Sequence, residues 1–218
     1  MRPARSLLLG LCALVLLASP ASAQDNAGPA LVLEGSGLVL EALNHRLTIP
    51  RPNWVDAAAT DLTPLVSTSF VIDDADAVLE IFPRFESRGF WTTIYGAYIT
   101  RANGRPISEF RDQAVSRYAQ TCQPEMVGFV QLGPDEDEKL APFIAVCGAY
   151  APASGNPARG EVMVMAFRQT DSGVGVVYQQ WRGKAFDPAD PASWPVETAI
   201  VEARATQFGG EVTLALVD

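Results

Sequence analysis

Two cysteines, Cys122 and Cys147, flank a segment whose middle holds four consecutive acidic residues, 135–138. Whether they pair limits the possible folds more than any other feature, because a disulfide would join two distant parts of the chain. The pair could also remain as thiols or bind a metal ion. Metal binding would require further soft ligands, yet the sequence has no Cys-x-x-Cys motif and a single histidine, His45. The sequence therefore favours a disulfide, provided that the compartment is oxidising.

The first 23 residues have the three parts of a secretory signal peptide. Arg2 and Arg5 precede an apolar run, residues 7–18, and the small residues 21–23 come before the expected cleavage site. The apolar run is too short for a membrane-spanning helix, which needs about 20 residues. We therefore expect a signal peptide over 1–23 and a periplasmic or secreted mature protein.

The third cysteine, Cys12, lies inside this apolar run. Leu11 precedes it at a position where a lipoprotein signal would need a small residue, so we do not expect lipidation. Cleavage removes Cys12 with the signal peptide. Cys122 and Cys147 then remain as an even pair in an oxidising compartment, which is the pattern expected of one disulfide bond.

The mature chain is strongly acidic. Loss of the two signal-peptide arginines lowers the formal net charge from −9 to −11. This argues against nucleic acid or an anionic membrane as a partner, because both are negatively charged. No second apolar stretch reaches spanning length, so we expect no transmembrane segment after cleavage. The expected organisation is a flexible leader over 24–36 and one globular domain over 37–218.

Strand patterns dominate this domain. Residues 37–50 alternate in hydrophobicity and predict one bent strand or two short ones, ended by proline. Residues 78–85 and 90–101 flank a turn and predict a hairpin. A second hairpin is predicted for 160–169 and 173–183, which are rich in β-branched and aromatic residues.

Two helices are predicted. The first begins near Ile107, with Ser108 as its N-cap and Glu109 in its first turn. Its apolar residues fall three and four apart along one stripe: Ile107, Phe110, Ala114, Val115, Tyr118 and Cys122. The second is predicted from Ser193 to about Phe208, ended by Gly209-Gly210, and a final strand follows it.

These patterns place the cysteines inside the fold. Cys122 ends the buried stripe of the first helix, and Cys147 ends a short apolar strand. The acidic residues between them contain turn formers and predict a solvated loop joining strands 126–132 and 143–149. We therefore expect an α+β domain with a single twisted, mainly antiparallel sheet, two helices packed on it and one disulfide.

The layout of the chain resembles a known group of domains. Residues 44–55, NHRLTIPRPNWV, form an apolar strand that ends in proline and is soon followed by Trp54, and antiparallel strands and a C-terminal helix come later. This layout is similar to the small exported domains of the Mog1/PsbP-like type. The resemblance covers most of the mature chain. It implies a non-catalytic accessory domain that docks onto a larger assembly, and it implies no particular functional residue.

The sequence offers little for catalysis. Any Ser-His-Asp triad or Cys-His dyad would need His45, which we interpret as an exposed turn residue. The sequence contains neither the Gly-x-Ser-x-Gly motif of a nucleophile elbow nor a phosphate-binding loop. The acidic residues 135–138 lack the spacing of a calcium loop. Paired carboxylates for glycoside hydrolysis remain open, because their separation depends on the fold. We expect no catalytic residue, no cofactor and no metal.

Several side chains are candidates for binding. Arg101 and Arg105 stand among the few positive charges of an acidic chain, and they predict either a patch for an anion or acidic partner or a solvated face with local ion pairs. Trp91 and Tyr95 predict either a cleft or core.

Two functions therefore remain open. The first is an exported, periplasmic accessory or protein-interaction domain with an unknown protein partner in the envelope. The alternative is a periplasmic small-ligand or anion-binding protein, or an unrecognised hydrolase.

Overall fold

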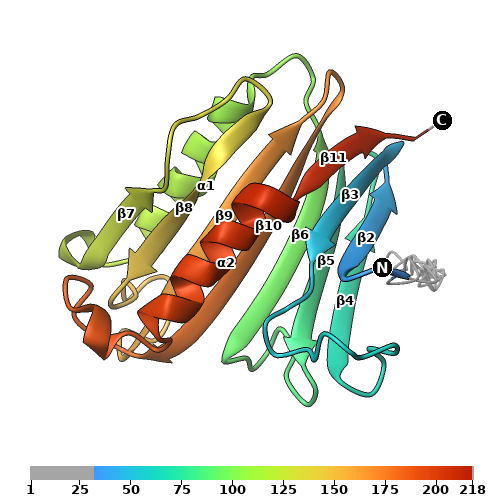
Figure 1. Ribbon diagram of the computed structural model, residues 1–218. Helices are drawn as coiled ribbons and strands as arrows, with labels where there is room; N and C mark the ends of the chain where they lie inside the picture. The colour runs from blue at the N-terminus through green and yellow to red at the C-terminus, as the bar shows by residue number, and fades with distance from the viewer. Residues whose placement is uncertain (1–31, 218) are drawn as a thin grey trace, which may run out of the picture.

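The protein is described by a computed structural model over residues 32–217, which contains two antiparallel sheets and two α-helices (Figure 1). The predicted signal peptide lies outside the described residues. Neither helix in this part of the chain is long and apolar enough to cross a membrane.

The larger sheet has seven strands, and both predicted hairpins lie in it. Every neighbouring pair is antiparallel. In spatial order the strands are β4 (Val66–Ile72), β5 (Asp76–Pro83), β6 (Thr93–Arg101), β10 (Gly173–Lys184), β9 (Arg159–Gln169), β8 (Lys139–Cys147) and β7 (Val127–Gln131). The hairpin predictions for β5–β6 and β9–β10 are confirmed. Strand β4 was not predicted, because its alternating serines and threonines give it no clear apolar face.

A second, four-stranded sheet shows that the expectation of a single sheet is wrong. Its order is β1 (Val32–Glu34), β2 (Gly37–Ala42), β3 (His45–Pro50) and β11 (Thr213–Leu216). The small sheet packs face to face on the large one: the side chains of Leu47 and Leu214 lie against Gly175 of β10. Apolar alternation identifies the buried face of a strand, but it does not say which strand lies beside it.

The predicted leader also ends earlier than expected. Residues 24–36 were assigned to it, but β1 pairs with β2 inside this range, from Val32↔Val39 to Glu34↔Gly37. The turn between the two strands has Gly35 at a φ of +57°, a conformation that glycine adopts without strain. The domain therefore includes residues from at least Val32 onward.

The two helices cover opposite faces of the large sheet. Successive side chains along a strand point to opposite faces. Helix α1 (Ile107–Thr121) shares a hydrophobic cluster with Phe143 and Met163, whereas α2 (Thr198–Glu211) shares one with Ile144 and Val164. In Figure 1, α2 crosses the near side of β8–β10 and α1 lies behind the sheet.

The helix limits differ from the predicted ones. Pro106, rather than Ser108, is the N-cap of α1, while Glu109 does lie in the first turn. The Ser193 hydroxyl donates to the carbonyls of Asp187 and Asp190, so it closes the preceding loop and its 3-10 turn, η2 (Pro191–Ser193), rather than capping α2.

The C-terminal end of α2 was also misplaced, because the helix continues through Gly209 to Glu211. Arg168 of β9 explains this: its guanidinium donates to the carbonyls of Phe208 (2.7 Å) and Gly209 (3.1 Å) at the helix end. Burial lowers the pKa of Arg168 to about 10, which leaves it charged at neutral pH. A buried cation that binds the last carbonyls stabilises a helix end that the glycines would otherwise weaken.

The sulfur atoms of Cys122 and Cys147 lie 2.10 Å apart, at the distance of a disulfide bond. The bond joins the end of α1 to the end of β8, as predicted, and the short 3-10 turn η1 (Pro124–Met126) leads from Cys122 into β7. The acidic residues 135–138 form an exposed loop, which Arg111 of α1 contacts through an ion pair of 2.7 Å with Asp135.

His45 is buried, so its interpretation as an exposed turn residue is wrong. Its side chain is 2% exposed beneath the β9–β10 turn. Nδ1 donates to the carbonyl of Leu43 (2.7 Å), and Nε2 lies 2.9 Å from the Thr170 hydroxyl. The tight turn between β2 and β3, just before His45, is made by Leu43 and Asn44, both at positive φ. His45 thus connects the small sheet to the large one.

The layers leave part of one sheet face uncovered. On one side, α2 covers β8 and β9, and the small sheet covers β5, β6 and β10. On the other side α1 packs on β8 and β9. Beside α1, the outer face of β5, β6 and β10 has no covering layer within residues 32–217.

Candidate functional site

A groove follows this uncovered face along α1. Its central part has a volume of about 660 Å³ and lies between the sheet and the helix. Tyr98 of β6 and Met163 and Met165 of β9 line it from the sheet. The helix contributes Phe110, Gln113, Ala114, Arg117, Tyr118 and Thr121.

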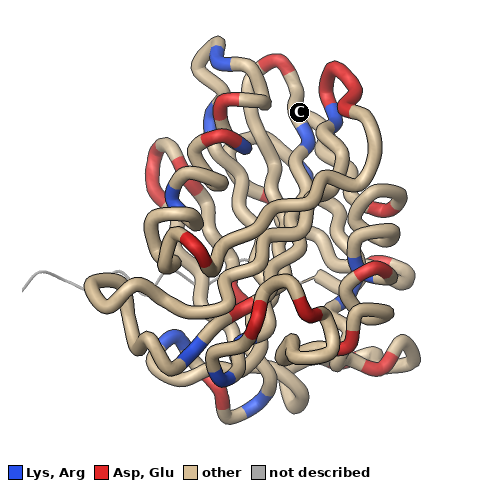
Figure 2. The backbone as a smooth tube through the Cα atoms, turned by 90° about the vertical axis from the view of Figure 1, so that its left-hand side faces the viewer, with Lys and Arg blue, Asp and Glu red and all other residues tan. Residues whose placement is uncertain are grey.

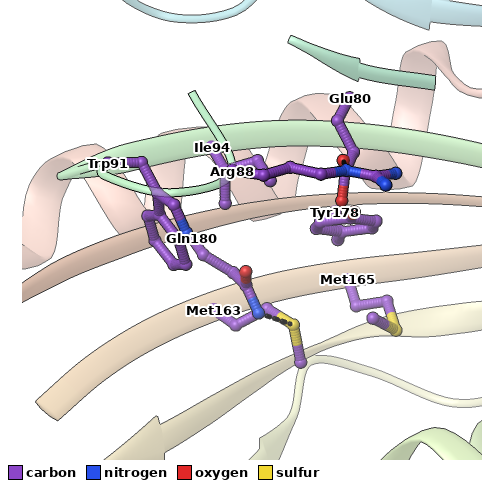
Figure 3. Close-up of a pocket in the computed structure, with 8 residues that line it drawn as sticks. All are labelled: Glu80, Arg88, Trp91, Ile94, Met163, Met165, Tyr178 and Gln180. Carbon is purple, nitrogen blue, oxygen red and sulfur yellow. Dashed lines mark hydrogen bonds and ion pairs between the residues drawn. The ribbon is translucent and has the colours of Figure 1, made fainter. Parts of the chain in front are cut away.

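Two further pockets extend the central one. The first, of about 280 Å³, is shown in Figure 3 and shares Met163, Met165 and Gln180 with the central part. The second, of about 370 Å³, shares Thr121 and Glu161 with it. Because the pockets have walls in common, they form one continuous depression, which we call the α1 groove.

The floor of the α1 groove depends on a glycine. A Cβ at Gly96 of β6 would overlap the ring of Tyr178 on the neighbouring strand β10. The bare backbone therefore lets the Tyr178 ring lie flat across β6. Figure 3 shows this ring beside Met165, with the Gln180 amide donating to the sulfur of Met163 (3.2 Å).

One end of the groove holds a cluster in which the half-buried Arg182 of β10 meets three buried side chains: Glu161 of β9, and Tyr150 and Trp91 from loops. We call it the Arg182 cluster. The Arg182 guanidinium lies 3.4 Å from the centre of the Trp91 ring and 5.3 Å from that of Tyr150. Its Nε donates to the Tyr150 hydroxyl (2.8 Å), and its Nη2 pairs with Glu161 (3.3 Å).

The same cluster determines the ionisation of Glu161. Its side chain is buried, which raises the pKa of the carboxyl, while the hydrogen bond from Tyr150 and the charge of Arg182 oppose the rise. Burial also raises the pKa of Tyr150, as does the neighbouring Glu161 carboxylate. The backbone carbonyl of Glu161 accepts from the Tyr118 hydroxyl of α1 (3.1 Å), so the cluster also contacts the helix.

Tyr98 lies on the floor at the centre of the groove. Burial raises the pKa of its hydroxyl to about 12, with Arg117 opposing and Asp76 adding to the shift. The hydroxyl therefore stays protonated at neutral pH and can donate a hydrogen bond.

The charge of the groove differs from that of the chain. The whole sequence has 25 acidic and 16 basic residues, and acidic positions occur on loops and on both helices (Figure 2). The groove lining reverses this ratio. It contains three carboxylates, Asp76, Glu80 and Glu161, and five arginines, Arg88, Arg105, Arg117, Arg159 and Arg182.

The four residues singled out in the sequence do not all reach the groove. Trp91 and Arg105 line it, and the Arg105 guanidinium lies 4.1 Å from the centre of the Phe110 ring. Tyr95 is fully buried on the opposite face, where its hydroxyl donates to the Pro50 carbonyl (2.6 Å).

Arg101 lies next to the groove residue Thr100, so its side chain is directed to the opposite face of β6, and it donates to the carbonyl of Asp74 (2.8 Å). Trp91 and Tyr95 are four residues apart, which would place them on one face of a continuous strand, but β6 begins only at Thr93, after Trp91. Alternation does not extend into the loop.

Sequence reasoning missed the Arg182 cluster. Its signal is present: Glu161 and Arg182 are charged residues within the two strands of a predicted hairpin that is rich in apolar residues, and a charge in a central strand needs a partner. The register places them directly opposite each other, as Arg182↔Glu161. Tyr150 comes from the loop that follows β8, and no local pattern predicts that contact.

The described residues contain no group of three or more His, Cys, Asp or Glu side chains placed to hold a metal ion. In the α1 groove, Glu80 pairs with Arg88, and Glu161 pairs with Arg182. The arrangement provides aromatic and thioether surfaces together with guanidinium donors, which suits binding of an apolar and anionic ligand.

The fold and the groove together define the class: a disulfide-bonded α+β domain with an open groove on one sheet face. The sequence matches no model of a known protein family, and no curated protein matches it. The similarity in layout to Mog1/PsbP-like domains therefore stays a prediction.

Proposed function

We propose that this protein is a non-catalytic, exported accessory domain that binds a partner protein in the α1 groove. The observation that carries the proposal is the unequal covering of the large sheet: one face is covered by α2 and the small sheet, while the other leaves β5, β6 and β10 open beside α1. A groove whose floor includes Tyr98, Met163 and Met165 is the kind of apolar, concave surface that receives side chains of a partner.

The remaining chemistry supports binding rather than catalysis. The single histidine, His45, hydrogen-bonds between the two sheets and does not line the groove, which lies on the other face of the large sheet. Two of the three groove carboxylates, Glu80 and Glu161, are already paired with arginines. The disulfide and the predicted signal peptide are compatible with an extracytoplasmic protein.

A crosslinking experiment tests this proposal. A photoreactive phenylalanine analogue replaces Gln113, an exposed α1 residue that lines the groove, and the matched control carries it at Asp112, an exposed neighbour outside the groove. Irradiation of living cells of the native host is expected to crosslink one defined protein at Gln113 and none at Asp112. The purified partner should bind the wild type and not Ala114→Trp, which fills the groove. Equal crosslinking from both positions would refute the proposal.

A second function has one observation in its favour. The pocket of about 370 Å³ at the Arg182 cluster falls within the usual size of small-ligand sites and presents Arg159 and Arg182. A thermal-shift screen with small carboxylates and phosphates checks this alternative, because a ligand at a hundred times its Kd adds about 2.7 kcal/mol of stability. If none of these compounds raises the melting temperature, this alternative is rejected and a partner protein remains the proposed occupant.

A further inference from the structure

Resting on the proposed function, we infer that the α1 groove takes an extended acidic segment of the partner, with apolar side chains on the floor and carboxylates at the arginines. The shape is the first argument. The central part alone measures about 660 Å³, and pockets of about 280 and 370 Å³ continue it. Small-molecule sites usually measure about 300–1,000 Å³. A groove that exceeds this range and is open along its length suits a chain rather than one compact ligand.

The unpaired charges of the groove give the second argument. Glu80 and Glu161 are neutralised by Arg88 and Arg182. Three lining arginines then remain, Arg105, Arg117 and Arg159, and none of them forms an ion pair within residues 32–217. Asp76 is the one lining carboxylate outside those two pairs. Three unpaired arginines in one groove of an otherwise acidic protein make that groove complementary to an acidic partner.

The floor provides the third argument. Met163 and Met165 lie beside Tyr98 in the centre of the groove. Methionine side chains are flexible and polarisable, so such a floor adapts to different apolar side chains. The occupant should therefore carry aliphatic or aromatic residues among its acids.

The Arg182 cluster supplies an anchor at one end. Trp91 and Tyr150 hold the guanidinium in place, and its Nε and Nη2 are engaged by Tyr150 and Glu161. The Nη1 group has no hydrogen-bond partner in the described part of the chain, and the residue lines the polar pocket of about 370 Å³. A guanidinium fixed in this way loses little entropy when it binds a carboxylate.

Other anionic chains fit the groove less well. Nucleic acid carries a charge on every phosphate, and its binding depends on a broadly basic surface. This chain has a net charge of −9, and the thioether floor offers no partner for a phosphodiester backbone. Of these anionic chains, an acidic polypeptide therefore fits the groove best.

A displayed library of random twelve-residue peptides, selected on the disulfide-bonded mature protein, tests the inference. Selected peptides should be enriched in Asp and Glu interspersed with apolar residues, and their affinity should fall as NaCl is raised. The variant Arg105→Glu/Arg117→Glu should bind them at least tenfold more weakly. The control Arg101→Glu makes the same kind of charge change on the opposite face and should alter affinity less than twofold. Circular dichroism confirms that each variant is folded.

Three outcomes would overturn the inference: no selected binder, enrichment of neutral or basic peptides, or equal losses with Arg101→Glu and Arg105→Glu/Arg117→Glu. The proposed function is judged separately by the crosslink at Gln113. Suppose that the crosslink forms and Ala114→Trp abolishes partner binding, but the arginine variants do not weaken that binding. The α1 groove is then the partner site, and the inference that the partner segment is acidic is wrong. If the crosslink also fails, the proposed function fails with it.

Discussion

The ring of Tyr178 lies directly over the backbone of Gly96, and this contact between neighbouring strands forms part of the α1 groove. A Cβ at residue 96 would occupy the space of the ring. The side chain of Tyr178 would then have to swing out into the groove, where it would obstruct the floor.

A double-mutant cycle tests this contact. Gly96→Ala should lower the free energy of unfolding by about 1–3 kcal/mol, the usual cost of overpacking, as measured by urea denaturation. In a Tyr178→Ala background the same change should cost less than about 0.5 kcal/mol, because the overlap is gone. Equal costs in both backgrounds would show that the ring does not depend on the glycine.

Arg168 provides a second test, at the end of α2. Its guanidinium donates to the carbonyls of Phe208 and Gly209, and to that of Val212 (2.8 Å) just beyond the helix. Arg168→Met leaves these buried acceptors without partners and should destabilise the protein by about 2–4 kcal/mol in urea denaturation.

The matched control is Arg101→Met, at an exposed arginine with one backbone hydrogen bond, for which we expect about 0.5 kcal/mol or less. Arg168→Lys keeps the charge but loses the forked geometry, so its effect should fall between the two. If Arg168→Met lowers the free energy of unfolding no more than Arg101→Met does, the end of α2 at Gly209 does not depend on the Arg168 guanidinium.

How much of the fold could be predicted depends on how local each signal is. The β5–β6 and β9–β10 hairpins were predictable, because alternation and turn residues lie within a short span of sequence. The division into two sheets was not, because strand alternation carries no information about the neighbouring strand. The end of α2 was missed for the same reason: Gly209 is a stop signal locally, and Arg168 overrides it from 41 residues away.

The site follows the same rule. Trp91 and Arg105 could be selected as unusual residues in an acidic, strand-rich chain, and both line the α1 groove. Tyr95 is likewise an aromatic residue in a predicted strand, but it lies in the core. The face to which its side chain points depends on where β6 begins, which the sequence did not show. The pairing of Glu161 with Arg182 needed the register of β9 against β10, which only the fold provides.

The disulfide gives a third prediction. Its two cysteines are 25 residues apart, and closing a loop of this size stabilises a protein by about 3–4 kcal/mol in the chain-entropy model. The variant Cys122→Ser/Cys147→Ser should lose about that much stability in urea denaturation.

Mass spectrometry of the mature protein provides the direct check on the bond. After alkylation without reductant, the intact mass should show no modified thiol, and after reduction it should show two. Two modified thiols before reduction would mean that the cysteines are not joined, and the predicted loss of stability in the serine variant would then have no basis.

The last prediction concerns pH and Glu161. Burial raises the pKa of its carboxyl in the folded protein above the usual value of 4.5. At a pH between the pKa of Glu161 in the unfolded chain and its higher pKa in the folded chain, the folded protein binds more protons at this site than the unfolded chain. The stabilising contribution of protonated Glu161 is therefore complete below the unfolded pKa and is lost as the pH rises toward the folded pKa.

Glu161→Gln isolates this effect, since the amide resembles the protonated acid at every pH. The free energy of unfolding of the wild type minus that of Glu161→Gln should become less favourable as the pH rises upward from about 4.5, in urea denaturation at a series of pH values. Tyr150→Phe removes a hydrogen bond that lowers the pKa of Glu161, so in that background the decline should extend to higher pH. A difference that grows more favourable with rising pH would show that pairing with Arg182 outweighs burial, and that the carboxylate is the form that the folded cluster prefers.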